Sequence, residues 1–162
     1  MKKQKGFSLI ELLIVVAIIL IIAAIAIPNL MRSKMAANQS SAVGSLRTIN
    51  TAQVTYSTTY PAVGYAVNLV TLGAAATVNC ATTAATSTAA CLIDPVLANG
   101  TKSGYIFKVA GGGGTPAVTY TSLATPQVAN QTGQNAYCSD QSGVLYYDGS
   151  GTGCTPGTST AL

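Results

Sequence analysis

A 21-residue apolar run near the amino terminus, residues 7–27, constrains the fold of this chain more than any other feature. A helix of that length rises about 31 Å, which is enough to cross the hydrocarbon core of a bilayer. Fifteen of its residues are Leu, Ile, Val or Phe, and together they favour membrane insertion by about 5 to 9 kcal/mol. Glu11 opposes insertion by about 3 kcal/mol at most. The sequence therefore predicts a membrane-spanning helix over residues 7–27.

Basic residues flank the apolar run and set its orientation. Lys2, Lys3 and Lys5 precede the run, so the positive-inside rule places the amino terminus in the cytoplasm. Arg32 and Lys34 beyond the far end weaken this asymmetry. We therefore expect the bulk of the chain to be exported, and the four cysteines in that part fit an oxidising compartment.

The composition excludes several classes of function. The chain has no histidine and only four acidic residues, which leaves little material for acid–base catalysis or for a histidine-ligated metal. The net charge of +4 includes three lysines ahead of the apolar run, and the rest of the chain has no basic patch that would bind a nucleic acid. We therefore expect a protein that is not an enzyme, has no cofactor and does not bind nucleic acid directly.

The start of the apolar run admits two interpretations. A removable signal peptide has a shorter apolar core followed by a small-residue cleavage site, whereas this run is longer and ends at Ile27 and Pro28. The run is therefore either a retained anchor or a segment whose leader is cut on its amino-terminal side. Gly6 stands between the lysines and Phe7, where it would present an extended backbone to a membrane peptidase.

Residues 5–15, with the sequence KGFSLIELLIV, resemble the class III leader junction of type IV pilins and type II secretion pseudopilins. The resemblance implies that residues 1–6 are a leader, that a prepilin peptidase cuts between Gly6 and Phe7, and that the new amino group of Phe7 is methylated. Glu11 is then the fifth residue after the cut, and Pro28 stands at the family's helix-breaking position. Close similarity covers roughly residues 5–30. Beyond them only the layout of a long helix, a loop, strands and late cysteines agrees.

Glu11 is the single acid in the apolar helix, and a lone carboxylate there is costly unless it is paired. Cleavage would expose the amino group of Phe7, so a neighbouring copy would supply a cation at the same depth, where a low dielectric strengthens the pair. The two groups also lie one helical turn apart within one chain. In the alternative interpretation Glu11 reaches the cytoplasmic interface and has no part in assembly. We expect the intermolecular pair, mostly because of the resemblance.

The helix is expected to continue as an amphipathic stalk over residues 28–60. Pro28 has no N–H and clashes with the preceding turn, so it either kinks or locally unwinds the helix, or ends it. Continuation is favoured by a mainly apolar stripe that follows at spacings of three and four residues until Pro61. The stripe consists of Ala42, Leu46, Ile49, Gln53, Tyr56 and Tyr60.

The remaining residues, 61–162, are expected to form a globular head. Residues 61–102 are rich in Ala, Thr and Gly and predict a mostly irregular loop with room for a short helix or strand. Later segments rich in aromatic and β-branched residues predict antiparallel strands at 103–109, 117–123, 135–139 and 144–147, with a turn at 111–116. The predicted fold class is α+β and pilin-like, a long helix whose second half packs on a sheet of three or four strands.

The four cysteines of the head are expected to form disulfides. Of three possible connectivities we prefer the sequential one, Cys80 with Cys91 and Cys138 with Cys154. Each bridge would destabilise the unfolded chain by about 3 kcal/mol. The spacings lack a C-x-x-C pair, which argues against zinc. In type IV pilins a late disulfide closes the C-terminal loop, and Cys138 with Cys154 resembles it, whereas the earlier pair departs from the simplest members.

Asp140 and Asp148 are weak candidates for a calcium site, because the major pseudopilin of the resembled family holds calcium in its C-terminal loop. Two scattered aspartates more often mark turns, and they would build only a weak oxygen cage. No metal is therefore expected.

The leading prediction for function is the major subunit of a type IV pilus, a helical homopolymer whose core is a bundle of the apolar helices. The resemblance implies a prepilin peptidase and an inner-membrane assembly platform as partners, and a passage from the inner membrane to an extracellular filament. Motility, adhesion and DNA uptake stay open as its role. One alternative is the major pseudopilin of a type II secretion system. Another is a membrane-anchored periplasmic binding domain that never polymerises.

Overall fold

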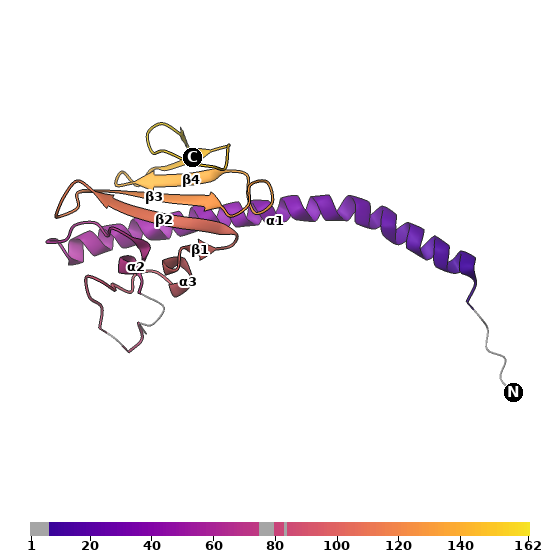
Figure 1. The fold of residues 1–162 in the computed structure, drawn as a ribbon, viewed down its shortest axis with the longest axis horizontal. Coiled ribbons are helices and arrows are strands. Elements are labelled where there is room, and N and C mark those ends of the chain that lie inside the picture. Colours follow the sequence, from indigo (N-terminus) through magenta and orange to yellow (C-terminus); the bar gives the residue numbers. More distant parts are fainter. Residues whose placement is uncertain (1–6, 75–79, 83) are drawn as a thin grey trace. The chain divides into compact units, whose positions relative to one another are not determined.

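The structure, a computed structural model, describes residues 7–74, 80–82 and 84–162. The chain falls into two compact units, Met1–Lys34 and Met35–Leu162. The leader predicted over residues 1–6, with Gly6, lies outside the described residues. In the second unit, the carboxy-terminal half of one long helix runs along a sheet, and the short helices lie beside the sheet's first strands (Figure 1).

Helix α1 spans Leu9–Thr59 and carries the predicted stripe into the core of the second unit. Its buried residues are Ala42, Ser45, Leu46, Ile49, Ala52, Gln53 and Tyr56. The last helical hydrogen bond runs from the N–H of Tyr60 to the carbonyl of Tyr56 at 2.9 Å. Pro61 follows and has no N–H to continue the ladder, so the helix ends there.

In the segment after α1, predicted as a mostly irregular loop, the described residues form two single-turn helices. Helix α2 spans Leu69–Leu72, and the Asn68 side chain caps it by accepting a backbone N–H at 2.9 Å. Helix α3 spans Pro95–Ala98, and the Asp94 carboxylate caps it in the same way at 2.9 Å. A proline at the first helical position suits α3, because the N–H it lacks would be unpaired in any case. Local capping therefore defines both helices.

In the part of the chain that the structure describes, the sheet has six antiparallel strands in chain order, where three or four were predicted. The strands are β1 (Thr101–Lys102), β2 (Tyr105–Gly112), β3 (Thr119–Pro126), β4 (Ala136–Asp140), β5 (Leu145–Asp148) and β6 (Thr160–Ala161). The additional strands, β1 and β6, have two residues each and pair with the outer edges of β2 and β5. The predicted strand number was wrong because a two-residue pairing leaves no alternating pattern in a sequence.

The central hairpin of β2 and β3 turns later than predicted. Gly111 and Gly112, expected in the turn, belong to β2 and pair with β3. The turn uses Gly113 and Gly114, whose φ angles of 84° and 105° suit glycine. A Cβ added to Gly111 would lie 3.0 Å from the side chain of Val67, so the close approach of the preceding loop accounts for a glycine inside the strand.

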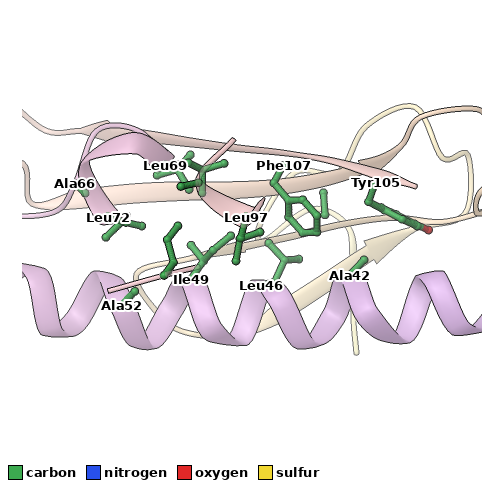
Figure 2. Close-up of a cluster of buried hydrophobic side chains, with 14 of the residues drawn as sticks. Ala42, Leu46, Ile49, Ala52, Ala66, Leu69, Leu72, Leu97, Tyr105 and Phe107 are labelled. Atoms are coloured by element: carbon green, nitrogen blue, oxygen red, sulfur yellow. The ribbon is translucent and has the colours of Figure 1, made fainter. Parts of the chain in front are cut away.

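The hydrophobic core of the second unit lies between α1 and the sheet, and the short helices add to it. Leu46 and Ile49 of α1 lie toward Leu97 of α3 and Phe107 of β2 (Figure 2). Strand β2 alternates buried and more exposed residues, and Tyr105 and Phe107 are on its buried face. Each such side chain contributes about 1.5 to 3 kcal/mol by leaving water, so this layer is the main source of head stability.

Polar side chains also hold α1 in the head. The buried Gln53 amide donates from Nε2 to the carbonyl of Ala66 at 3.0 Å and accepts the Ala66 N–H at 2.8 Å. The Tyr120 hydroxyl donates to Asn50 Oδ1 at 3.1 Å, and the Asn50 amide donates to Ser139 Oγ at 2.8 Å. Within the described ranges, every buried side-chain nitrogen and oxygen has a partner. These bonds specify the position of α1, because an unpaired buried group would cost about 1 to 3 kcal/mol.

Candidate functional site

The amino-terminal end of α1 is capped by a side chain of its own first turn. The helix begins at Leu9, and the Ser8 N–H donates to Glu11 Oε2 at 3.0 Å. This contact is one half of a capping box, in which a glutamate three residues into a helix satisfies the N–H of the capping serine. The S-x-x-E spacing from Ser8 to Glu11 is the sequence signal for this cap. The role predicted for Glu11 was an ion pair with a second copy, and the cap was not predicted.

The Glu11 carboxylate keeps acceptor capacity beyond this cap. An ionised carboxylate has about four lone-pair positions, and the Ser8 N–H occupies one. Glu11 is exposed and forms no ion pair with any described residue. Its place in the first turn also puts negative charge at the positive end of the helix dipole. The side chain can therefore cap its own helix and accept a cation from a second copy at the same time.

The first half of α1 exposes a continuous apolar surface. Phe7, 79% exposed, precedes the helix, and the large apolar residues from Leu9 to Met31 are all exposed as well. Among the described helices, α1 is the one long and apolar enough to cross a membrane, and its most apolar stretch has no buried residue. A surface of this kind marks a membrane or protein contact, since soluble monomers rarely expose large contiguous apolar patches.

Pro28 lies inside α1 and does not end it. The helix is continuous from Leu9 to Thr59, so neither a helix end nor an unwound turn occurs at Pro28, and a kink there stays a prediction. The missing N–H deprives the Ala24 carbonyl of its helical donor. A shallow groove lined mainly by apolar atoms adjoins the proline. Its lining residues are Ala26, Ile27, Asn29, Leu30 and Ser33.

Both disulfides of the structure follow the sequential pairing. The sulfurs of Cys80 and Cys91 are 2.04 Å apart, and this bridge closes the loop after α2. Cys138 of β4 is bonded to Cys154 at 1.99 Å, which ties the segment after β5 to the middle of the sheet. No free cysteine occurs among residues 7–74, 80–82 and 84–162. The second bridge therefore closes a C-terminal loop onto a buried strand.

The structure does not bring Asp140 and Asp148 together. Asp148 pairs with Ala136 at the start of β4, and Asp140 is the last residue of that strand, so the two aspartates lie at opposite ends of the β4–β5 pair. At about 3.3 Å per residue their backbones are roughly 13 Å apart. Each carboxylate instead closes a turn, accepting the N–H of Ser142 at 2.9 Å and of Ser150 at 2.7 Å. Because they lie so far apart, Asp140 and Asp148 do not form one calcium site.

Burial and hydrogen bonds shift the pKa values of a few ionisable groups of the head. Burial raises the pKa of Tyr120 to about 12, with a smaller contribution from the neighbouring hydroxyl of Tyr65. Burial also raises the pKa of Tyr105. Partial burial would raise the pKa of Asp94, but hydrogen bonds from the α3 backbone and from Lys102, at 3.0 Å, outweigh it and lower the pKa. These groups keep one protonation state across the neutral range.

Known proteins resemble part of the chain. Residues 1–27 match the family described as the prokaryotic N-terminal methylation motif. The chain is 50% identical over 54 residues to the type IV major pilin protein PilA of Myxococcus xanthus. It is 58% identical over 40 residues to the type IV wide pilus major component PilA4 of Thermus thermophilus. Over part of its length, the chain is similar to type IV pilins.

This similarity confirms the resemblance predicted from residues 5–15. The aligned stretches cover 33% and 25% of this chain, and only 24% and 30% of the two relatives. No solved structure matches the chain. The predicted α+β arrangement of a pilin is confirmed by the long apolar helix and the antiparallel sheet.

Proposed function

We propose that this chain is the major structural subunit of a type IV pilus, anchored in the inner membrane before assembly and part of an extracellular filament afterwards. The exposed apolar first half of α1, joined to a methylation motif over residues 1–27, carries this proposal. Both relatives are pilus components by name. A helix that its own chain leaves uncovered needs either lipid or identical helices around it.

The proposal includes leader cleavage between Gly6 and Phe7 by a prepilin peptidase and methylation of the Phe7 amino group. Phe7 is exposed and precedes the first residue of α1, which suits an extended peptidase substrate. Removal of residues 1–6 takes away three lysines that hold the amino terminus at the cytoplasmic surface. The processed subunit is then easier to extract from the membrane, with an inner-membrane assembly platform supplying the work.

In the proposed filament, Glu11 of each subunit accepts the charged amino group of Phe7 from a neighbouring copy. The cap from Ser8 leaves lone pairs free for this contact. Moving the apolar helix from lipid into a bundle of identical helices is nearly neutral in hydrophobic terms, because both surroundings are apolar. Close packing and the ion pair therefore favour assembly, and repetition of one contact that does not close gives a fibre.

Mass spectrometry of the processed amino terminus, together with electron microscopy of the cell surface, tests the proposal. We expect a chain that starts at N-methylated Phe7 and filaments built from it. A chain that retains residues 1–6 in cells with a complete assembly system would favour an anchored periplasmic binding domain. A processed chain without surface filaments, whose deletion blocks protein secretion, would favour a major pseudopilin. Twitching, attachment and transformation assays of the deletion strain separate motility, adhesion and DNA uptake.

A further inference from the structure

Two basic residues, Arg32 and Lys34, stand just beyond the apolar run, at the end of the first unit. Both side chains are exposed, and neither forms an ion pair with any residue that the structure describes. The sequence contains no acidic residue between Glu11 and Asp94, so neighbouring segments offer no counter-ion. The positive-inside rule gives no reason for these charges either, because cations on the exported side oppose the predicted orientation. The reason for them therefore lies outside the chain itself.

The length of the apolar run fixes the depth of these cations in a bilayer. Helix α1 is continuous through Pro28, so the helical rise continues beyond Ile27. At 1.5 Å per residue, the Cα atoms of Arg32 and Lys34 lie about 8 and 11 Å past the end of the run. The polar headgroup layer on each side of the hydrocarbon core is about 5 to 8 Å thick. Helical side chains lean toward the amino-terminal end of their helix, so both cations reach back to the level of the lipid phosphates.

An apolar groove lies beside the two cations. Its lining residues are Ala26, Ile27, Asn29, Leu30 and Ser33. Residues three and four apart are neighbours on a helix. Arg32 follows Asn29 by three residues, and Lys34 follows Leu30 by four, so each cation is a neighbour of the lining. The Asn29 amide and the Ser33 hydroxyl can both donate hydrogen bonds. The groove thus combines an apolar surface with hydrogen-bond donors and positive charge.

The depth of the groove identifies the kind of molecule that occupies it. Before assembly the apolar run lies in the bilayer, so the groove lies at the boundary between hydrocarbon and headgroups, where lipid surrounds the helix. A phospholipid offers an acyl chain to the apolar lining and phosphate oxygens to the donors. Its headgroup has to be acidic to use the cations fully, because a zwitterionic headgroup carries a cation of its own. Each Lys or Arg near an anionic surface strengthens binding by about fivefold.

We propose that this groove, with Arg32 and Lys34, binds an acidic phospholipid of the leaflet on the exported side. The phosphate lies at the two cations, and the start of an acyl chain lies on the apolar lining. The inference rests on the proposed function, which anchors the subunit in the membrane before assembly. The bound lipid fixes the depth at which α1 leaves the membrane. Leader removal takes away Lys2, Lys3 and Lys5 at the opposite surface, so this contact then holds the processed helix in position.

Titration of the full subunit, purified from the membranes of its own cells, tests the site. The probes are short-chain phosphatidylglycerol, which is acidic, and short-chain phosphatidylcholine, which is zwitterionic, each added in neutral detergent. A variant with Arg32→Gln and Lys34→Gln removes both charges at exposed helix positions and keeps a good helix former there. A control variant with Arg47→Gln and Lys108→Gln removes the same charge from exposed positions of the head.

For the wild type we expect phosphatidylglycerol to bind at least about tenfold more tightly than phosphatidylcholine. The variant without Arg32 and Lys34 should bind phosphatidylglycerol about thirtyfold more weakly, since two cations contribute about fivefold each. The control variant should bind it like the wild type. Added salt should weaken binding by the wild type more than binding by the variant, because it screens the two charges. Equal melting temperatures of all three proteins show that the head is folded.

Unchanged phosphatidylglycerol affinity in the variant, an equal loss in the control, or no preference of the wild type for the acidic lipid would overturn the inference. Glycerol 3-phosphate that binds as tightly as the lipid would also overturn it, since the groove would then take a free anion. None of these measurements requires a filament. Retention of residues 1–6, or absence of filaments from wild-type cells, would instead defeat the proposed function, so the two failures are distinguishable.

A photoactivatable phosphatidylglycerol locates the bound lipid directly. The full subunit is placed in nanodiscs that contain this lipid, irradiated and digested, and the crosslinked peptides are identified by mass spectrometry. Crosslinks within residues 26–34 that disappear from the variant without Arg32 and Lys34 support the inference. Crosslinks confined to other residues, or unchanged in the variant, overturn it.

Discussion

Two substitutions of Glu11 separate the cap at the start of α1 from the charge that the filament is proposed to use. Glu11 Oε2 accepts the Ser8 N–H at 3.0 Å, and a glutamine keeps an oxygen for this bond, whereas alanine removes both the acceptor and the charge. Glu11→Gln should therefore preserve the helix start, and Glu11→Ala should destabilise it by about 1 kcal/mol. Neither change hinders membrane insertion, because the ionised carboxylate opposes insertion by up to about 3 kcal/mol.

The effect on assembly follows from the charge that loses its partner. In the proposed filament the amino group of Phe7 lies against Glu11 of a neighbour, among apolar helices. Removing one member of a buried pair costs about 3 to 5 kcal/mol, and about 1.4 kcal/mol corresponds to a factor of ten. Both variants should therefore weaken the addition of a subunit by roughly two to three and a half orders of magnitude. Subunits should accumulate in the membrane while filaments disappear.

The assay compares filaments sheared from cells with the membrane pool by immunoblotting, and it includes the mass of the processed amino terminus. A start at N-methylated Phe7 in both variants shows that the leader was removed, so a loss of filaments then reports on assembly alone. Wild-type filament yield from Glu11→Gln would refute the charge pair. Filaments retained by Glu11→Gln and lost by Glu11→Ala would assign the whole effect to the cap.

Three further predictions concern the head and are measured on the detergent-solubilised full chain. Gln53→Leu leaves the N–H and the carbonyl of Ala66 buried without their partner. The free energy of unfolding in urea should therefore fall by at least about 2 kcal/mol. An unchanged value would mean that other partners replace Gln53. Raising the pH from 10 to about 12 should destabilise the head, because Tyr120, with its pKa raised to about 12, stays protonated when folded and ionises from pH 10 upward when unfolded. Tyr120→Phe should show a smaller loss over this range, and an equal loss would exclude Tyr120 as the cause. Replacing Cys138 and Cys154 together by serine opens a loop with a sequence separation of 16. The free energy of unfolding should fall by about 3 kcal/mol, and the melting temperature should fall with it. An unchanged melting temperature would contradict this prediction.

The long helix and its buried face were predictable because both follow from periodicity. The apolar run is long enough for a membrane span, and the stripe at three- and four-residue spacing contains most of the α1 residues that the core buries. The strands of the later hairpin, predicted at 135–139 and 144–147, differ by one residue from β4 (Ala136–Asp140) and β5 (Leu145–Asp148). Alternation of aromatic and small residues carries that information in the sequence itself.

Elements that depend on a few hydrogen bonds could not be predicted from the sequence. Helices α2 and α3 have four residues each, too few for a periodic pattern, and the caps from Asn68 and Asp94 define them. Gln53 belongs to an otherwise apolar stripe because its partner, Ala66, folds back against α1 from beyond the helix end. The glycine at position 111 inside β2 is likewise explained by Val67, which approaches it only in the folded chain.

The candidate site shows the same division between local and long-range information. The charge of Glu11 in an apolar helix was evident from the sequence, and the cap from Ser8 has a local spacing that the sequence also contains. The separation of Asp140 and Asp148 has no such signal, because it depends on the register of β4 and β5 in the folded sheet.

The two halves of α1 have different roles, because one stabilises the head and the other is proposed to act in assembly. Residues from 42 onward bury a face and stabilise the head, whereas the apolar first half has no buried residue and contributes nothing to that core. In lipid or in a helix bundle this half meets apolar surroundings, so the difference between the two states is small and depends on how closely side chains pack. Isoleucine and valine dominate residues 14–27, and in a helix each has one strongly preferred rotamer. Their side chains therefore lose little conformational freedom on bundling, so that in the proposed filament modest packing and one ion pair per subunit would favour assembly.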